Sequence, residues 1–201
     1  MIKFKTVSLM TIITLAASLT ALAAYAATPK DAVEVQVQKV ITTLAEPAFK
    51  DQPREAKIEK IRSIINDIFD YTELSRRTLG RDWAKFNPTQ QQEFIRLFSD
   101  LLEKTYADRL LAYSNEKVVF DKENMLNEGQ AEVFSNVFTA DGKKIPLDYR
   151  LILKDGQWRV YDVIIEGISL IRNYRDQFRD ILAKNPPEQV LKVLRDKARE
   201  G

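Results

Sequence analysis

Apolar residues recur at helical spacing through the first half of the chain and at strand spacing through much of the second half. From Thr28 to about residue 113, apolar positions fall three or four residues apart, which places them on one face of a helix. From Lys117 the period shortens to two, which is typical of a strand. A helical pattern returns near the C-terminus. This order predicts helices, then an antiparallel sheet, then helices.

Proline and capping residues mark where the predicted helices begin. Thr28-Pro29 and Asn87-Pro88 each combine an N-cap residue with proline at the first helical position. The alternation of Val33, Val35 and Val37 also allows a strand, but charged flanks and length favour a helix. Further helices are predicted over 53–68, over 69–80 with a glycine stop, to about 113 after Asn87, over 168–182 and over 187–199.

Four strands are predicted over residues 119–121, 131–139, 144–154 and 157–165. Asp141-Gly142 and Asp155-Gly156 are both typical of two-residue hairpin turns, and such turns fix the register of an antiparallel sheet. Counting back from the turns gives the predicted pairs: Leu153 with Trp158, Leu151 with Val160, Tyr149 with Asp162, Leu147 with Ile164, Phe138 with Ile145, and Phe134 with Tyr149.

One face of this sheet is apolar and partly aromatic, so helices must cover it. We therefore predict an α+β fold of the NTF2-like kind: a curved four-stranded antiparallel sheet wrapped by helices around an apolar pocket. The predicted pocket wall from the sheet is Phe134, Phe138, Ile145, Leu147, Tyr149, Ile164 and Ile168. The predicted helical side of the pocket is Leu74, Phe98, Leu102 and Tyr106.

Some charged residues need an explanation of their own. Asp162 falls on the predicted apolar face, where a carboxylate requires a hydrogen bond, and Tyr149 is its expected donor. A headgroup contact is the alternative. Arginines gather around residues 76–81 and along residues 172–179. They form either a solvated surface or a contact for lipid phosphate or an acidic partner.

The N-terminal residues resemble an export signal. Lys3 and Lys5 precede an apolar run, and Ala24-Tyr25-Ala26 fits a cleavage site, so residues 1–26 are predicted to be removed. The alternative is a transmembrane anchor. Residues 27–201 are long enough for one domain. Without the two lysines, 29 basic residues face 29 acidic ones. A neutral chain of this kind does not indicate nucleic-acid binding.

Residue types that carry much of enzyme chemistry are absent. The sequence has no histidine and no cysteine, which removes disulfides, the usual zinc ligands and every Ser/Cys–His dyad. Carboxylate pairs stay available among the 29 acidic residues, but none lies in a distinctive motif. We expect no catalytic residue, no metal site and no cofactor.

Three segments together resemble the MlaC family, also called the toluene-tolerance auxiliary or phospholipid-binding family. They are FDYTELSRRTLGRDW (69–83), QQQEFIRLFSDLLEKTYADRL (90–110) and WRVYDVIIEGISLIRNYR (158–175). The resemblance implies a periplasmic carrier of glycerophospholipids that maintains outer-membrane lipid asymmetry. It also implies two partners, an outer-membrane lipoprotein–porin complex and an inner-membrane ABC transporter with an MCE-domain ring. Ile145 and Ile168 fall where the family pattern has aliphatic residues beside the pocket.

The sequence therefore predicts a periplasmic phospholipid shuttle that is not an enzyme. A first alternative is a periplasmic chaperone or lipoprotein carrier that uses the same apolar groove. A second is an NTF2-like hydrolase or isomerase, which would need a polar, titratable pocket. A third is a structural interaction module with a filled core.

Overall fold

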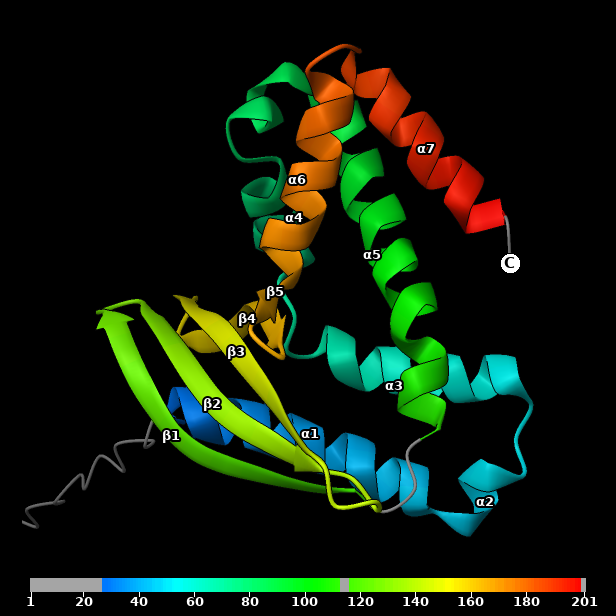
Figure 1. Ribbon diagram of the computed structural model, residues 1–201, viewed down its shortest axis with the longest axis vertical. Helices are drawn as coiled ribbons and strands as arrows, with labels where there is room; N and C mark the ends of the chain where they lie inside the picture. Colours follow the sequence, from blue (N-terminus) through cyan, green and yellow to red (C-terminus); the bar gives the residue numbers. More distant parts are fainter. Residues whose placement is uncertain (1–26, 113–115, 200–201) are drawn as a thin grey trace, which may run out of the picture.

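Helices occupy residues 29–111, with short connections between them, and a five-stranded antiparallel sheet follows them (Figure 1). The computed structural model describes residues 27–112 and 116–199, so the predicted export signal lies outside the described residues. The helices are α1 (Pro29–Ala45), α2 (Pro47–Lys50), α3 (Arg54–Asn66), α4 (Tyr71–Leu79), the 3-10 helix η1 (Gly80–Lys85), α5 (Pro88–Leu111), α6 (Leu170–Leu182) and α7 (Pro187–Arg199). The strands are β1 (Lys117–Asn127), β2 (Gln130–Phe138), β3 (Lys144–Lys154), β4 (Gln157–Ile165) and β5 (Ile168–Ser169).

The two helix starts predicted from an N-cap residue followed by proline are confirmed, whereas the helix predicted from residue 168 begins at Leu170, after the strand β5. Thr28 begins α1 with a capping box, in which its hydroxyl accepts from the Asp31 amide at 3.1 Å. Asn87 begins α5 in the same way, and its side chain accepts from the Gln90 amide at 2.9 Å. These bonds satisfy amides that have no partner inside the helix. Gly80 ends α4 with a φ of +55°, a backbone conformation that glycine adopts without strain.

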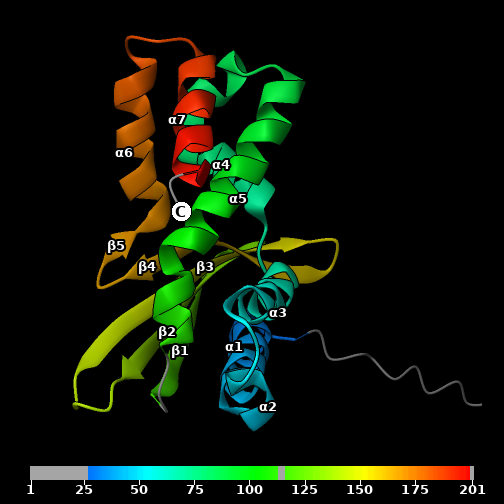
Figure 2. The same ribbon diagram turned by 90° about the vertical axis from the view of Figure 1, so that its right-hand side faces the viewer.

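Two regions can be distinguished in the molecule. The helical region consists of α4, η1, α6, α7 and the first part of α5, which stand together at one end (Figures 1 and 2). The sheet region consists of the five strands, α1, α2, α3 and the last turns of α5. The curved sheet has an inner face turned towards α1 and an outer face on the opposite side (Figure 2).

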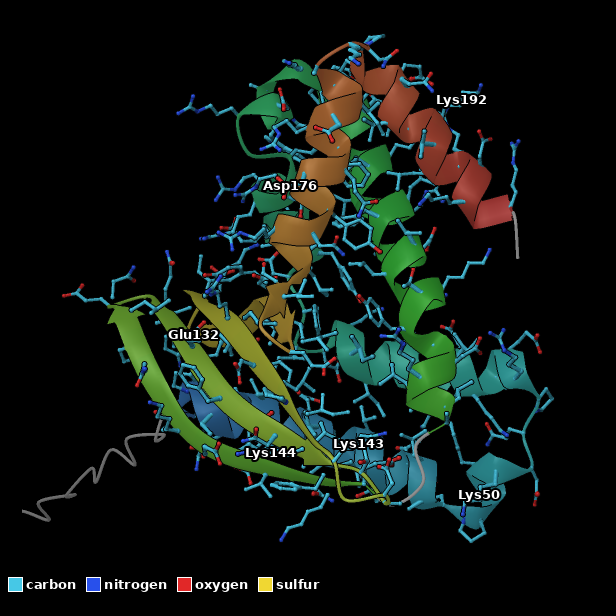
Figure 3. All side chains as sticks on the ribbon, viewed as in Figure 1. Lys50, Glu132, Lys143, Lys144, Asp176 and Lys192 are labelled. Atoms are coloured by element: carbon cyan, nitrogen blue, oxygen red, sulfur yellow. The ribbon has the colours of Figure 1, made fainter. Side chains whose placement is uncertain are left out.

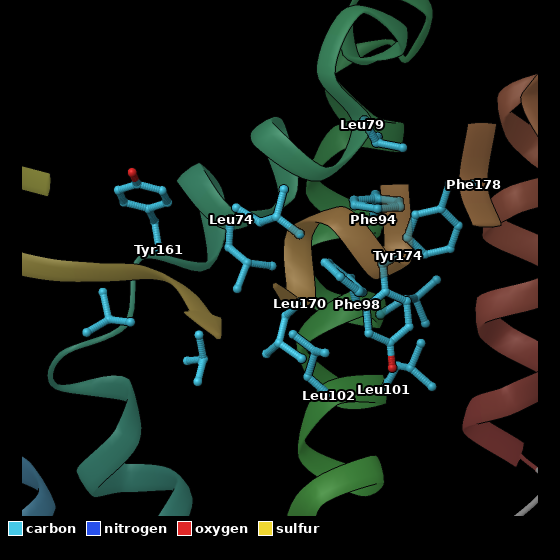
Figure 4. Packing of buried hydrophobic residues seen from close by; sticks show 14 of the residues in the cluster. Leu74, Leu79, Phe94, Phe98, Leu101, Leu102, Tyr161, Leu170, Tyr174 and Phe178 are labelled. Carbon is cyan, nitrogen blue, oxygen red and sulfur yellow. The ribbon is translucent and has the colours of Figure 1, made fainter. Parts of the chain in front are cut away.

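Aromatic rings fill the centre of the helical region (Figure 4). The ring centroids of Phe98 and Tyr174 lie 5.0 Å apart, and those of Phe94 and Phe178 lie 5.4 Å apart, both edge to face. Edge-to-face pairs add to the stabilisation that burial itself supplies. The helical region therefore has a filled, well-packed core.

The strand count and the extent of the first strand differ from the prediction. The sheet has five strands rather than four, because a tight turn at Glu166-Gly167 returns the short strand β5 against β4. Glu166 and Gly167 have φ values of +50° and +81°. The strand β1 spans Lys117–Asn127, although the alternating pattern predicted only residues 119–121. A shift in pairing near Asp121 interrupts that pattern.

The predicted register between β2 and β3 is wrong by one residue. Tyr149 pairs with Val133 instead of Phe134, and Ile145 pairs with Val137 instead of Phe138. The connection is longer than two residues, since the Thr139 amide donates to the Lys143 carbonyl at 3.0 Å. A slip of one residue moves every side chain of a strand to the other face. Phe134 and Phe138 therefore lie on the outer face.

The predicted register between β3 and β4 holds near the turn and fails beyond it. Asp155-Gly156 forms the hairpin, and Leu153–Trp158 and Leu151–Val160 pair as predicted. Tyr161 is then an extra residue, a β-bulge, so that Tyr149 pairs with Val163 and Leu147 with Ile165. The predicted pairs Tyr149–Asp162 and Leu147–Ile164 are wrong, and Asp162 and Ile164 belong to the outer face. The Arg77 guanidinium lies 4.0 Å from the Tyr161 ring centroid, a contact that holds the bulge.

Candidate functional site

The inner face of the sheet carries a continuous apolar surface. The rings of Phe120 and Tyr149 stack with their centroids 6.3 Å apart, and Val33 of α1 joins the same cluster. Leu147, Ile165 and Ile168 form a row across three neighbouring strands, because Leu147 pairs with Ile165 and Ile165 with Ile168. The other members of the inner face include Val133, Leu151, Val160 and Val163.

This inner surface is incompletely buried. Phe120, Leu147 and Ile165 are only partly buried although they are large and apolar. Ile168, at the end of the row, is 61% exposed. Apolar area left in contact with water is the surface that a hydrocarbon ligand would cover. The row from Leu147 to Ile168 therefore marks one edge of a candidate apolar site.

The predicted sheet residues divide between the two faces. Ile145, Leu147, Tyr149 and Ile168 share the inner face, as predicted. The other three predicted sheet residues lie on the outer face: Phe134, Phe138 and Ile164. On that face, the Lys122 ammonium lies 5.1 Å from the Phe134 ring centroid.

The predicted helical residues also lie in different surroundings. Leu74 and Phe98 are fully buried in the helical region, where other side chains pack around them (Figure 4). Leu102 and Tyr106 lie further along α5, and Tyr106 is only partly buried. Leu102 and Tyr106 are therefore better placed than the other two to contact a ligand beneath the sheet.

Two hollows among the described residues contain none of the predicted pocket residues in their lining. The first lies between α3 and α5 and measures about 30 Å³. That volume holds roughly one or two water molecules, against the several hundred Å³ of a typical ligand pocket. The second is an open groove of about 660 Å³ between α1 and α3, lined mostly by polar residues such as Glu34, Lys39 and Lys60. The apolar pocket beneath the sheet stays a prediction.

Asp162 has hydrogen-bond partners other than the predicted Tyr149. Its carboxylate accepts from the Ser169 hydroxyl at 2.6 Å and from the Ile171 amide at 3.1 Å. The Arg150 guanidinium lies 3.5 Å away. Burial raises the pKa of the Asp162 carboxyl, and these contacts only partly oppose that rise. Asp162 thus ties the start of α6 to β4, next to the β5 strand that carries Ile168.

Charged side chains cover the outside of both regions (Figure 3). On the outer face of the sheet, Glu132 pairs with Arg150 at 3.0 Å. In the helical region, Arg76 and Arg77 both pair with Glu73, and Arg175 donates to the Arg77 carbonyl at 2.7 Å. The two arginine groups predicted from the sequence are therefore adjacent, across α4 and α6.

Within residues 27–112 and 116–199, no set of three or more His, Cys, Asp or Glu side chains is arranged to hold a metal ion. No helix in that part of the chain combines the length and apolar character needed to cross a membrane. The candidate site is apolar, and it offers contact and exclusion of water.

Several residues of the inner face were not predicted as site residues. Phe120 lies within the first predicted strand, but it was missed because no turn signal fixed the register of that strand. Val163 and Ile165 were missed because no local signal marks the bulge at Tyr161. Val37 of α1 lies on a predicted helical stripe, but a stripe alone does not indicate which sheet face it covers.

Comparisons with known proteins give a consistent result. The model of the family described as MlaC protein matches residues 34–196. The chain is 28% identical over 167 residues to the intermembrane phospholipid transport system binding protein MlaC of Haemophilus influenzae, covering 77% of this chain and 78% of that protein. It is 28% identical over 163 residues to toluene tolerance protein ttg2D of Pseudomonas putida, covering 80% and 75%.

A solved structure is similar as well. It is the phospholipid-binding protein from Ralstonia solanacearum in complex with a phospholipid, with a TM-score of 0.75 and 25% sequence identity. The match covers 85% of this chain and 96% of that one.

Proposed function

The chain belongs to the MlaC protein family, and we propose that it binds a phospholipid and carries it between membranes. The observation that carries the proposal is the inner face of the sheet, where large apolar side chains stay partly exposed at the row Leu147, Ile165 and Ile168. A similar fold in a relative of known structure is described in complex with a phospholipid.

The energetics of hydrocarbon in water support such a site. Each methylene transferred from water to an apolar surface gains about 0.8 kcal/mol. A sixteen-carbon chain therefore carries roughly 12 kcal/mol, which makes unassisted passage through water very slow. A carrier has to offer comparable apolar contact and still release the lipid. Reversible contact with aliphatic and aromatic side chains meets both needs.

The residues proposed to contact acyl chains follow from the observed register. They come from the inner face and from the part of α5 nearest to it, and Phe134, Phe138 and Ile164 are left out because they lie on the outer face. The proposed set is Leu102, Tyr106, Phe120, Ile145, Leu147, Tyr149, Val163, Ile165 and Ile168.

The location and partners belong to the same proposal. Removal of residues 1–26 would leave a single domain over 27–201 in the periplasm. The family resemblance implies exchange with an outer-membrane lipoprotein–porin complex and with an inner-membrane ABC transporter that carries an MCE-domain ring. No catalytic step is proposed.

The decisive test is the ligand that the protein holds when isolated. The full chain is expressed in a Gram-negative host, purified from the periplasm without detergent, denatured, and its extract analysed by mass spectrometry. We expect phospholipid in near-stoichiometric amount. A well-folded protein that yields no lipid, or that yields peptide instead, would contradict the proposal and favour the chaperone alternative.

A further inference from the structure

Helix α3 is lightly packed for its length. Of its thirteen residues only Ile61 is buried, whereas α6, which has the same length, buries Leu170, Ile171, Tyr174, Phe178 and Leu182. Elements with little buried apolar surface separate from the rest of a protein at low free energy. The helix α3 is therefore expected to open more readily than α6.

The two ends of α3 are held very differently. After its C-terminal end, the Ile68 carbonyl accepts from the Val160 amide, and the Asp70 amide donates to the Val160 carbonyl, both at 2.8 Å. At its N-terminal end, Pro53 supplies no side-chain cap. The ion pair between this end and α5, Arg54–Asp108, has both side chains more than half exposed, and the Lys57 ammonium donates to the Lys50 carbonyl of α2, which moves with α3. Residues 66–70 can thus serve as a hinge, while the N-terminal end is lightly held.

The interface between α3 and α5, here called the α3–α5 seam, contains the hollow of about 30 Å³. Apolar side chains line most of it. A second ion pair closes its rim, because the Arg62 guanidinium lies 2.5 Å from the carboxylate of Glu103, a largely buried side chain on α5. The apolar lining consists of Ile58, Ile61, Ile65, Ala107, Leu110 and Leu111.

The seam leads towards the inner face of the sheet. On α5, Glu103 and Ala107 face α3, and the neighbouring residues Leu102 and Tyr106 belong to the main core cluster or pack against it. In Figure 2, the end of the sheet that holds the β2–β3 connection lies on one side of the lower part of α5, and α3 lies on the other. An acyl chain that passed between α3 and α5 would therefore reach the apolar surface beneath the strands.

We propose that the α3–α5 seam is the path by which an acyl chain reaches the inner face of the sheet, and that α2 and α3 turn about residues 66–70 to open it. This inference rests on the proposed lipid-carrier function. The pairs Arg54–Asp108 and Arg62–Glu103 hold the seam closed, and the hollow reduces the apolar contact that opening would break. In the closed seam, α3 and α5 bury each other's apolar side chains. Hydrocarbon that enters the open seam packs against the same side chains.

A cross-link across the seam provides the main test. The chain has no cysteine, so the double variant Arg54→Cys/Asp108→Cys can be joined selectively with a short bifunctional maleimide. Delipidated protein is mixed with vesicles that contain a phospholipid with a fluorescent acyl chain, and the rate of uptake is measured. We expect the joined protein to take up lipid at least about tenfold more slowly than the same variant left unjoined, because local opening is prevented.

A matched cross-link in the helical region serves as the control. Arg195 of α7 pairs with Glu93 of α5 at 2.7 Å, so Glu93→Cys/Arg195→Cys can be joined in the same way. Uptake by this joined variant should stay within about twofold of its unjoined form, since these helices pack against a closed core. Equal uptake with and without the α3–α5 cross-link, or equal slowing by both cross-links, would overturn the inference. Failure of the unmodified protein to take up any lipid would contradict the carrier function itself.

A pair of single substitutions tests the seam without a cross-linker. Arg62 pairs with Glu103 across the seam and with Glu59 inside α3, at 3.0 Å. Glu103→Gln should raise the uptake rate by roughly threefold, because the loss of one partly exposed ion pair across the seam has a modest effect. Glu59→Gln should leave the uptake rate nearly unchanged. Equal rates for both variants would argue against an opening between α3 and α5.

Discussion

The helical region and the sheet region use apolar residues in different ways. In the helical region, Phe94 and Phe98 are both fully buried among edge-to-face rings. In the sheet region, Phe120 and Leu147 face the inside and are still only partly buried. The first arrangement stabilises the fold. The second leaves apolar surface that the protein itself does not cover.

The helical region is therefore expected to contribute mainly to stability, and the inner face of the sheet mainly to the proposed lipid binding. Truncation of a residue in a filled core costs much stability, because its neighbours cannot close the space. Truncation of a partly exposed residue costs less, since one side already faces solvent or a ligand. Substitutions in the helical region should therefore change unfolding, and those in the sheet region should change lipid retention.

The largest expected effect compares two phenylalanines. Phe98→Ala should lower the free energy of unfolding by about 3–5 kcal/mol, and Phe120→Ala by only about 1–2 kcal/mol. Urea unfolding followed by circular dichroism measures both. Similar losses at the two positions would mean that the sheet region is as tightly packed as the helical one.

A second prediction compares the two faces of the sheet. Leu147→Gln on the inner face should lower the amount of retained phospholipid about tenfold, which is roughly 1.4 kcal/mol of binding free energy. Phe134→Gln on the outer face should leave retention unchanged. Mass spectrometry of detergent-free preparations measures both variants. Loss of lipid from the Phe134 variant alone would restore the register expected from the sequence and contradict the observed one.

A third prediction concerns pH and the contact between α6 and β4. Burial raises the pKa of the Asp162 carboxyl in the folded state, so the folded protein keeps this proton to a higher pH than the unfolded chain does. The contribution of this proton to stability is complete below the unfolded pKa of about 3.9 and declines as the pH rises through the folded pKa. Asp162→Asn removes this dependence.

The measurement is urea unfolding of both proteins between about pH 4 and pH 7. The free energy of unfolding of the unmodified protein should fall relative to that of the Asn variant as the pH rises. Parallel pH profiles would show that ionisation of Asp162 does not affect folding.

The smallest expected change in stability is at Ile168. Because its side chain is 61% exposed, Ile168→Ser should alter the free energy of unfolding by no more than about 0.5 kcal/mol. The same substitution should still reduce lipid retention, since the row from Leu147 to Ile168 loses its outer member. Thermal unfolding and lipid quantification on one preparation test both parts. A destabilised protein with normal lipid retention would mean that Ile168 stabilises the fold and does not contact lipid.

The sequence was sufficient at several places where a local signal decides the backbone, although Asp141-Gly142 did not form the two-residue hairpin that it predicted. Thr28 and Asn87 placed the starts of α1 and α5, because a capping side chain acts within one turn of a helix. Asp155-Gly156 placed the β3–β4 hairpin, because few residue pairs adopt its backbone angles readily. The absence of histidine and cysteine by itself limits the chemistry that the side chains can perform.

The sheet register, and with it the identity of the inner face, was decided only by the tertiary structure. The longer connection at residues 139–143 and the bulge at Tyr161 each moved the pairing by one residue, and so Phe134, Phe138 and Ile164 changed sides. Side chains alternate along a strand, so a single added residue reverses which ones are covered. The added residue in β4, Tyr161, is stabilised by a contact with Arg77, which lies far away in the sequence. The alternation of residues along one strand does not reveal such a contact.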